Sequence, residues 1–515
     1  MASRFGEAQT QDSRVTPRRV LALPNWLALA LILMAAAIYL WPIAAFSDDT
    51  DEGVYWQSLR AMASGHPLFS SVFSSQAPLF LPSLYPFYLL FGQTIAAARA
   101  AVVVYALVGI VAIYWLGAQI GGKWGGLIAA ALLTVDYHYA LQGRTLQADA
   151  PAVALEILAV AIGVAASRRF GRSRLALAAL TGVAVALATL MKLTEICALV
   201  PIAVYLGAPL LRAFDGGEGR IQRPSAAGLR IGARATALGL GMVAVGGLIT
   251  TGIVLAPFAS DLSEIWRQAV TFHLAAAHLP GGSLTGNLRV IIREARWAGL
   301  TAALALGIAY WRRDWRMGPP LLWLIASTLI LLRQFPLFDH IAILIVPCLA
   351  LMSSLAPAML GPVTTKVTGR WLSLGFAVLT CAVFAGGLYS AIKTTAHDAA
   401  RQPSLTVKTQ LAAIEAYTAP GETIITDDQY AAASIGRNVP PELVDTSYVR
   451  VASGFLTASQ VEAILARDNV RVVVFATGRL NSAHGLQAWL SARSQVVDLG
   501  GSGRVYLLTS GQGAG

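Results

Sequence analysis

The chain has 515 residues, of which 56% are hydrophobic and only 13% are charged. A soluble globular protein carries about 25% charged residues, so this composition predicts a polytopic membrane protein instead. The formal net charge of +11 arises from Arg and Lys residues that lie largely in short loops between apolar runs. That distribution is typical of membrane topology, so we expect a lipid bilayer as a partner and no nucleic acid.

Apolar segments of spanning length recur along the first three quarters of the chain. A helix that crosses a membrane needs about 20 mostly apolar residues. The first run is too long for the core of a cleavable signal peptide, so we interpret it as a membrane helix. The candidate segments are residues 20–46, 95–118, 124–141, 150–167, 175–192, 195–211, 235–258, 297–311, 319–334, 341–360 and 371–392. The sequence therefore predicts an all-α bundle of about eleven transmembrane helices, residues 20–392.

The loops between these segments differ in charge on the two sides of the predicted membrane. Loops on one side are basic, from the N-terminal tail (residues 1–19) to RRFGRSR at 168–174 and RRDWR at 312–316. The opposite side holds an acidic cluster, SDDTDE, at 47–52. Cytoplasmic loops carry an excess of Lys and Arg, so we expect a cytoplasmic N-terminus and an extracytoplasmic C-terminus in a multi-pass plasma (inner) membrane protein.

Two regions outside the spans have their own character. Residues 259–296 are amphipathic, and we expect them to form two interfacial helices on the outer surface. Residues 393–515 have the composition of a small α/β domain. The stretches ETIITDD and VRVVVFA predict strands, LTASQVEAILARD predicts a helix with a Thr cap, and SARSQVVDLGGSGRVYLLTS predicts a terminal hairpin. No P-loop follows a strand, which excludes a pump with its own nucleotide domain.

The first outer loop, residues 47–94, is long for a chain whose other connections are short. It begins SDDTDEGVYW, with four carboxylates in five positions. These acids can cap a surface helix, with Thr50 or Asp51 as the cap and Glu52 in the first turn. Alternatively, one carboxylate acts as a general base, because burial and neighbouring acids raise its pKa. Long loops are usually functional, which favours the second interpretation.

Several motifs, taken together and in order, resemble one family of membrane enzymes. They are Asp51-Glu52 and Tyr55, QAPLF at 76–80, LFG at 90–92, LQGRTLQADAPAVALEILAVAI at 141–162, MKLTEICALVPIAVYL at 191–206 and FPLFDHIAILIVPCLALMSS at 335–354. This set is similar to the polyprenyl-phosphate-dependent glycosyltransferases of the C superfamily. Within that superfamily, the protein O-mannosyltransferases and the aminoarabinose transferase of lipid A are the most similar.

The resemblance implies a membrane bundle with its active site at the outer face. It implies the transfer of one sugar, with inversion, from a polyprenyl-phosphate donor to a glycan, lipid or protein acceptor. It also implies that Asp51 is the catalytic base, with Glu52 as its positioning neighbour. A positioned carboxylate that removes the proton of an attacking hydroxyl contributes about 10²–10⁴-fold to the rate. Tyr55 and Gln76, in the same loop, are candidate contacts to the substrate, although a structural role is the simpler explanation of each.

The departing lipid phosphate needs cationic hydrogen-bond donors near the membrane surface, and no cofactor is required for this. Arg144, Lys192, His340 and Arg333 are candidates, because all four are expected at outer ends of helices. Lys192 could instead only extend its side chain to the interface, and Arg144 could only pair with Asp149.

Other polar residues have two interpretations each. His340 follows Asp339, which can cap a helix and leave a surface histidine. Asp149 precedes Ala-Pro, as a helix N-cap does, and it also matches the family's second acidic residue. Asp49 and Asp51 form a DxD pattern that would bind a divalent ion only if the reaction uses one.

The C-terminal region and the remaining function classes leave alternatives open. Asp427, Asp428 and Arg437 can form a site, although a turn with a solvated face explains them as well. A secondary transporter or flippase of a cell-envelope lipid would also be polytopic and helical. Transporters place ionisable residues near the bilayer midplane and often in repeated halves, whereas these acids cluster in an outer loop. A scaffold protein would leave the acids of that loop without a role.

Overall fold

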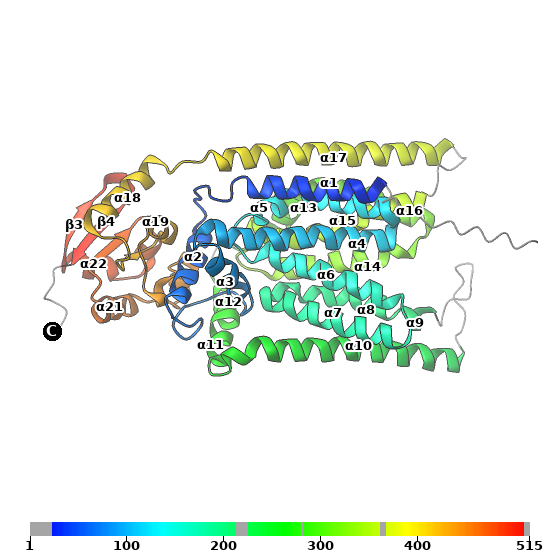
Figure 1. Cartoon of the computed structure of the whole chain (residues 1–515), viewed down its shortest axis with the longest axis horizontal. Helices are drawn as coiled ribbons and strands as arrows, with labels where there is room; N and C mark the ends of the chain where they lie inside the picture. Colours follow the sequence, from blue (N-terminus) through cyan, green and yellow to red (C-terminus); the bar gives the residue numbers. More distant parts are fainter. Residues whose placement is uncertain (1–22, 213–224, 280–281, 361–366, 509–515) are drawn as a thin grey trace, which may run out of the picture.

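The computed structural model describes residues 23–212, 225–279, 282–360 and 367–508, so the predicted cytoplasmic tail of residues 1–19 lies outside the described residues. Long helices run side by side in a bundle, and a small domain with a β-sheet lies at one end of it (Figure 1). The helix α2 (Thr50–Ala63) of the first outer loop lies at that same end. The prediction of a polytopic helical bundle with a small C-terminal α/β region is therefore confirmed.

Nine helices among the described residues are long and apolar enough to cross a membrane. The elements within these spans are α1 (Leu23–Leu40), α4 (Ile95–Val135), α6 (Asp149–Ser167), α7 (Gly171–Met191), α8 (Leu199–Leu206), α9 (Ala208–Arg212), α10 (Ala226–Leu255), α14 (Gly318–Arg333), α15 (Val346–Ser354), α16 (Ala356–Leu360) and α17 (Val367–Ala399). Two features, α4 and α13 (Leu284–Arg312), account for the difference from the expected number of about eleven.

The first feature is a reversal of the chain within α4. Gly122 has φ of +76°, a conformation outside the helical range that glycine adopts without strain. A Cβ atom on Gly126 would lie 2.5 Å from the backbone oxygen of Tyr114, and one on Gly117 would lie 2.9 Å from the Cα atom of Gly126. A straight helix would hold these residues several turns apart. The two halves of α4 therefore form a helical hairpin, as the separate segments 95–118 and 124–141 predict, and the short α5 (Tyr137–Gln142) follows the second half.

The second feature corrects the prediction for residues 259–296. Only its first part forms short helices, α11 (Leu262–Trp266) and α12 (Phe272–Ala276), joined by a π-helical turn. The predicted second interfacial helix is instead the first half of α13, which continues through the predicted segment 297–311. The charged residues of that half made the apolar run look too short.

Small residues allow the membrane helices to approach closely. A Cβ atom on Gly182 of α7 would lie 1.9 Å from the backbone oxygen of Val243 in α10, and one on Gly246 would lie 2.0 Å from that of Ala179. Apolar side chains gain no hydrophobic driving force between helices in lipid, so close backbone packing at small residues takes its place.

The C-terminal sheet has the strand order β1-β2-β4-β3, with β1 and β2 parallel and the other pairs antiparallel. Its strands are β1 (Ile425–Thr426), β2 (Val472–Phe475), β3 (Ser494–Asp498) and β4 (Arg504–Leu508), and its helices are α18 (Leu405–Tyr417), α19 (Gln429–Ser434), α20 (Tyr448–Ala452), α21 (Ala458–Arg467) and α22 (Leu486–Ser491). Thr457 caps α21 in a capping box, as the sequence predicts. The last membrane helix α17 continues to Ala399, beyond the predicted boundary at residue 393.

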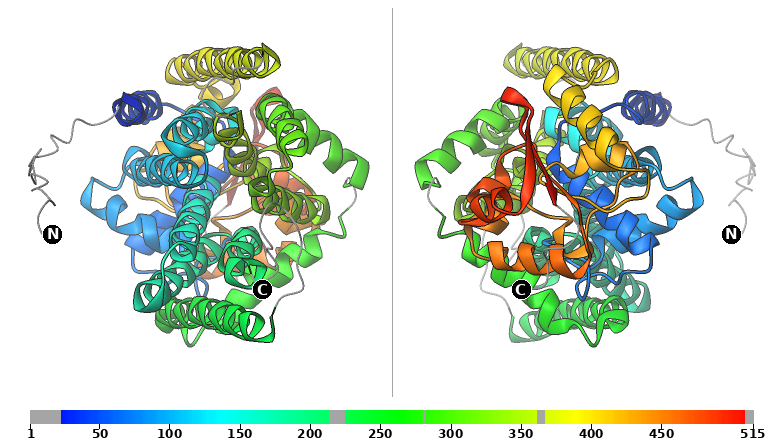
Figure 2. Two further views of the ribbon diagram at one scale, coloured as in Figure 1. Left: turned by 90° about the vertical axis from the view of Figure 1, so that its right-hand side faces the viewer. Right: turned by 90° about the vertical axis from the view of Figure 1, so that its left-hand side faces the viewer.

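The C-terminal domain packs directly on α2 of the first outer loop. A Cβ atom on Gly53 would lie 2.3 Å from the backbone nitrogen of Tyr430 in α19, so only glycine permits this approach. Gln57 of α2 donates a hydrogen bond to the backbone oxygen of Arg437 at 3.0 Å. The view from that end shows the domain over the ends of the membrane helices (Figure 2). The first outer loop is thereby held between the bundle and the domain.

Candidate active site

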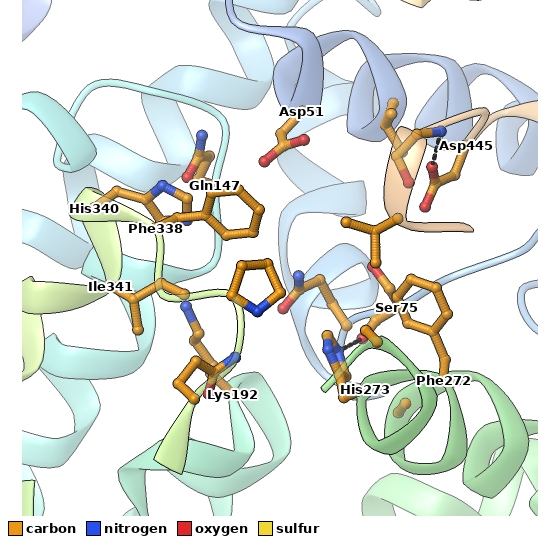
Figure 3. A pocket seen from close by; sticks show the side chains of 18 of the residues that line it. Asp51, Ser75, Gln147, Lys192, Phe272, His273, Phe338, His340, Ile341 and Asp445 are labelled. Carbon is orange, nitrogen blue, oxygen red and sulfur yellow. Dashed lines mark hydrogen bonds between the residues drawn. The ribbon is translucent and has the colours of Figure 1, made fainter. Parts of the chain in front are cut away.

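A cavity of about 670 Å³ lies where the first outer loop, the ends of several membrane helices and the C-terminal domain meet. Its polar lining comes from segments far apart in the sequence (Figure 3). The ionisable or hydrogen-bonding residues that line it include Asp49, Asp51, Tyr55, Gln76, Gln147, Asp149, Lys192, His273, His340, Asp445, Tyr448 and Arg479. The cavity thus contains most of the site residues that the sequence predicts.

Asp51 lies in the first turn of α2 and faces the cavity. The helix is capped by Asp49, whose Oδ1 accepts a hydrogen bond from the Asp51 amide at 2.9 Å, so the expected caps Thr50 and Asp51 are wrong by one or two residues. Within the described part of the chain, the Asp51 carboxylate makes no hydrogen bond. Burial, together with the charges of Asp49 and Asp445 and against the opposing effect of Arg479, raises the pKa of Asp51 to about 7.

Glu52 points away from the cavity and into the protein. Its carboxylate forms a bidentate pair with Arg99 of α4, at 2.8 Å to Nε and 2.6 Å to Nη2, and also accepts the amide of Leu146 at 2.6 Å. Burial by itself would raise the pKa of Glu52, but the Arg99 guanidinium holds it below its ordinary value. Because Glu52 is 1% exposed and does not line the cavity, it anchors α2 and cannot touch a substrate there.

Asp149 and Lys192 form an ion pair in the cavity wall, with 2.5 Å between Oδ1 and Nζ. Asp149 lies in the first turn of α6 and is not the N-cap, a position that Ala148 holds. Lys192 directly follows α7, so its ammonium reaches the cavity from the end of a membrane helix. An ammonium has three N–H donors, and the pair with Asp149 leaves others for a ligand.

His340, Tyr55 and Gln76 also line the cavity, whereas two predicted cations do not. The His340 ring stacks on Phe338, and Gln76 donates a hydrogen bond to the hydroxyl of Tyr55 at 2.8 Å. Arg144 does not form the alternative pair with Asp149 either, because it pairs with Asp398 at 2.8 Å. That contact ties the turn before α6 to the end of α17 and keeps Arg144 out of the cavity. Arg333 is exposed and lies outside the cavity as well.

Several cavity residues could not be selected from the sequence. His273 lies in α12, and its Nε2 is 2.9 Å from the backbone oxygen of Ser75. Burial lowers the pKa of His273, so a neutral imidazole is favoured. Gln147 donates a hydrogen bond to Asp49 at 2.7 Å, and Asp445, Tyr448 and Arg479 come from the C-terminal domain. The amphipathic segment that contains His273 was a signal for this surface, but no sequence spacing linked the C-terminal residues to the first outer loop.

The acids of the DxD pattern and the polar residues of the possible C-terminal site are the two remaining candidate sites from the sequence. Asp49 of the DxD pattern accepts hydrogen bonds through both oxygens, from Asp51 and Gln147. No group of three or more His, Cys, Asp or Glu residues that could hold a metal occurs among the described residues. Asp427 is fully buried and accepts the backbone amides of the turn after β2, and Arg437 donates to backbone oxygens, so both are structural.

A second cavity, of about 840 Å³, adjoins the first. It shares Asp49, Gln147 and His340 with the first cavity, and most of its other lining residues come from α4, α5, α13 and α17. Its wall is largely apolar in the part formed by α17. His138 Nε2 and Glu294 Oε2, 2.7 Å apart, lie at its polar side. Two spaces thus meet close to the acids of the first outer loop.

Comparisons with known proteins agree with this architecture. Residues 75–213 match the family model of dolichyl-phosphate-mannose-protein mannosyltransferase. Among solved structures, ArnT from Cupriavidus metallidurans bound to undecaprenyl phosphate is similar with a TM-score of 0.63 and 15% identity, covering 96% of this chain and 100% of that one. AglB, the oligosaccharyltransferase of Archaeoglobus fulgidus, is similar with a TM-score of 0.55 and 13% identity, covering 94% and 74%. A search of curated proteins finds no match.

The matches have one fold in common. ArnT and AglB are both glycosyltransferases of the C superfamily, and so are the mannosyltransferases that the family model describes. The resemblance inferred from the motifs of the first outer loop and of the membrane segments is therefore confirmed. The family model matches neither the α2 segment nor the C-terminal domain, so the geometry of this chain alone bears on the roles of Asp51 and of the cavity residues from that domain.

Proposed function

We propose that this membrane protein, with the fold of C-superfamily glycosyltransferases, transfers one sugar from a polyprenyl-phosphate donor to a hydroxyl acceptor. The observation that carries the proposal is the cavity in which the free carboxylate of Asp51 and the ammonium of Lys192 both lie. The pKa of Asp51, about 7, suits a general base near neutral pH. The similar ArnT structure holds undecaprenyl phosphate, and the AglB structure holds dolichol-phosphate and an inhibitory peptide, which supports a lipid-phosphate donor here.

In the proposed reaction, Asp51 takes the proton of the acceptor hydroxyl while that oxygen attacks the anomeric carbon. The bond between the anomeric carbon and the phosphate oxygen breaks, and its electron pair leaves with the polyprenyl phosphate. Attack from the face opposite the phosphate inverts the configuration of the sugar. Lys192 and His340 stabilise the departing phosphate as a cation and as a hydrogen-bond donor. These residues supply the charge stabilisation that the step needs, so we propose a reaction without a metal or other cofactor.

Asp149 is a positioning residue in this proposal. Its carboxylate holds the Lys192 ammonium at the cavity wall, 2.5 Å away. Tyr55 and Gln76 are hydrogen-bonded to each other in the lining of the same cavity, and they offer further hydrogen bonds to the sugar. The second cavity shares Asp49, Gln147 and His340 with the first, so it offers a separate route for a substrate into the cavity that holds Asp51.

The charge pattern of the loops supports an extracytoplasmic site. The C-terminal domain and the first outer loop lie at the same end of the bundle, and the basic loops are predicted at the other end. A position at the end of the bundle also favours a transferase over a transporter, whose ionisable residues gather near the bilayer midplane.

Asp51→Asn tests the proposal in proteoliposomes that contain polyprenyl-phosphate sugars and extracted envelope acceptors. Because the amide cannot take a proton, we expect kcat to fall about 10²–10⁴-fold while donor binding and thermal unfolding stay unchanged. Asp48→Asn is the matched control, because Asp48 belongs to the same acidic cluster, does not line the cavity, and is 59% exposed with one ion pair, to Arg401 at 3.2 Å. An Asp51→Asn variant with more than a tenth of the wild-type kcat would exclude Asp51 as the base. Wild-type protein that transfers no sugar from any lipid-linked donor would overturn the proposed function.

A further inference from the structure

We infer that the C-terminal domain supplies the acceptor-binding wall of the cavity, through Asp445, Tyr448 and Arg479, and that this wall takes a sugar hydroxyl. The inference rests on the proposed transfer reaction. It adds a class of acceptor, a glycan or glycolipid with a free sugar hydroxyl, and a set of specificity-determining residues that lie outside the membrane bundle.

These three side chains have hydrogen-bonding capacity that the protein leaves unused. Across the described ranges, the Arg479 guanidinium makes no hydrogen bond and no salt bridge, although it lines the cavity. Asp445 is only 5% exposed. Its Oδ1 accepts one hydrogen bond, from the amide of Ser447 at 2.8 Å. Tyr448 is 52% exposed and lines the same wall. Asp445 and Arg479 line the same cavity, and neither forms an ion pair among the described residues, so both can bind a ligand there.

The backbone that carries Arg479 is rigidly held. The buried carboxylate of Asp427 accepts the amides of Ala476 at 2.6 Å, Thr477 at 2.9 Å and Leu480 at 3.3 Å. These bonds fix the turn after β2 on both sides of Arg479. A side chain on a fixed turn at a cavity wall is preorganised for binding.

The turn that carries Asp445 is fixed by Arg450, which also contacts the first outer loop. Arg450 donates hydrogen bonds to the backbone oxygens of Asp445 at 2.6 Å and of Glu442 at 2.8 Å. Its guanidinium lies 3.6 Å from the centroid of the Phe73 ring in the first outer loop, a cation–π contact. The wall is therefore held in a fixed position relative to the loop that carries Asp51.

The position of the wall matches the side from which an acceptor must arrive. In Figure 3, Asp51 and Asp445 lie at one side of the cavity and Lys192 at the other. In a substitution with inversion, the attacking oxygen and the leaving phosphate lie on opposite faces of the anomeric carbon. A phosphate at Lys192 therefore places the attacking hydroxyl between Asp51 and the C-terminal wall.

The chemistry of the wall favours a sugar over other acceptors. A carboxylate accepts hydrogen bonds from neighbouring hydroxyls, a guanidinium donates several in a planar fork, and a tyrosine ring offers an apolar face. This combination of acceptor, donor and ring is complementary to a neutral polyhydroxylated ring. An extended peptide would instead need a strip of backbone donors and acceptors along the wall. The groups proposed for binding here are side chains, which suit a sugar ring better.

The test separates acceptor binding from donor binding in the full-length protein. Arg479→Gln and Asp445→Asn keep the size of each side chain and, in the second case, the acceptor for the Ser447 amide. Arg471→Gln is the matched control for the arginine, because Arg471 lies in the same domain and is 60% exposed. Initial rates are measured with short soluble glycosides, with an envelope glycolipid and with a Ser/Thr peptide, and donor affinity is measured by binding of polyprenyl phosphate.

We expect the KM for glycosides or glycolipid to rise at least tenfold in both variants, with donor affinity within twofold of wild type and Arg471→Gln unchanged. Use of soluble glycosides would point to a glycan polymer, and use of the glycolipid alone would point to a lipid-linked acceptor. Lost donor affinity in the variants, an unchanged KM in both, or a peptide as the best acceptor would each overturn the inference. If the wild-type protein transfers sugar in the same assay, the proposed function stands even when one of these outcomes overturns the inference about the wall.

Discussion

Replacing Glu52 should damage the stability of the protein and not the chemistry of the reaction. The Glu52 and Arg99 side chains are 1% and 5% exposed and are joined by two hydrogen bonds of 2.8 and 2.6 Å. Removing one partner of such a buried pair leaves a charge without compensation, which costs about 3–5 kcal/mol. Glu52→Gln keeps Oε1 as an acceptor for the Leu146 amide and for Arg99 Nε, but it removes the negative charge and the acceptor of Arg99 Nη2.

The assay is thermal unfolding in detergent, together with kcat per folded molecule at a temperature well below the transition. One kcal/mol shifts the midpoint by about 2–4 °C in proteins of about 150–250 residues, so we expect a loss of several degrees for Glu52→Gln and for Arg99→Met. The double variant should lose less than the sum of the two, because neither charge is then left alone. An unchanged midpoint with a kcat as low as that of Asp51→Asn would refute this reasoning and make Glu52 a catalytic group.

Two further predictions follow from the site and from its docked domain. The carboxylate of Asp51 is the active form and its pKa is about 7, so kcat/KM should reach its maximum well above pH 7 and fall about tenfold per pH unit well below pH 7. Asp445→Asn should move this fall in kcat/KM to lower pH, and Arg479→Gln should move it to higher pH. A pH profile that is unchanged in both variants would contradict the arrangement of charges. Gly53→Ala should separate the C-terminal domain from α2, because the new Cβ would lie 2.3 Å from the Tyr430 nitrogen. Limited proteolysis after residue 400 should therefore become faster. Gly375→Ala in α17 is the control, and it should leave the cleavage rate unchanged because a Cβ there meets nothing within 4 Å.

Features that depend on local pattern were predictable from the sequence. The apolar runs, the capped helix at Thr457 and the terminal hairpin depend on neighbouring residues, so a single sequence reveals them. Asp51, Lys192 and His340 were found because they lie at predicted outer ends of membrane helices or in the loop beside them. Such positions share one surface of the bundle whatever the packing of the helices in between.

Features that depend on contacts between distant segments were not predictable. Arg144 was expected to bind the donor phosphate or to pair with the nearby Asp149, but the end of α17 brings Asp398 to it instead. The wall with Asp445 and Arg479 reaches the cavity only because Gly53 lets α19 lie against α2. Charge and spacing in the first outer loop contain no information about that approach.

The two adjacent acids of the first outer loop show how one helix can assign opposite roles to neighbouring residues. Successive residues in an α-helix point about 100° apart, and here Asp51 lines the cavity whereas Glu52 points to Arg99. Helix α2 starts at Thr50 because Asp49 caps it, and this start turns Asp51 to the cavity and Glu52 to Arg99. If the helix began one residue later, the acids would rotate and the base would lose its place. The cap, the buried anchor and the base are therefore one unit, and a variant of Asp49 that cannot accept the Asp51 amide should shift Asp51 and also release Gln147.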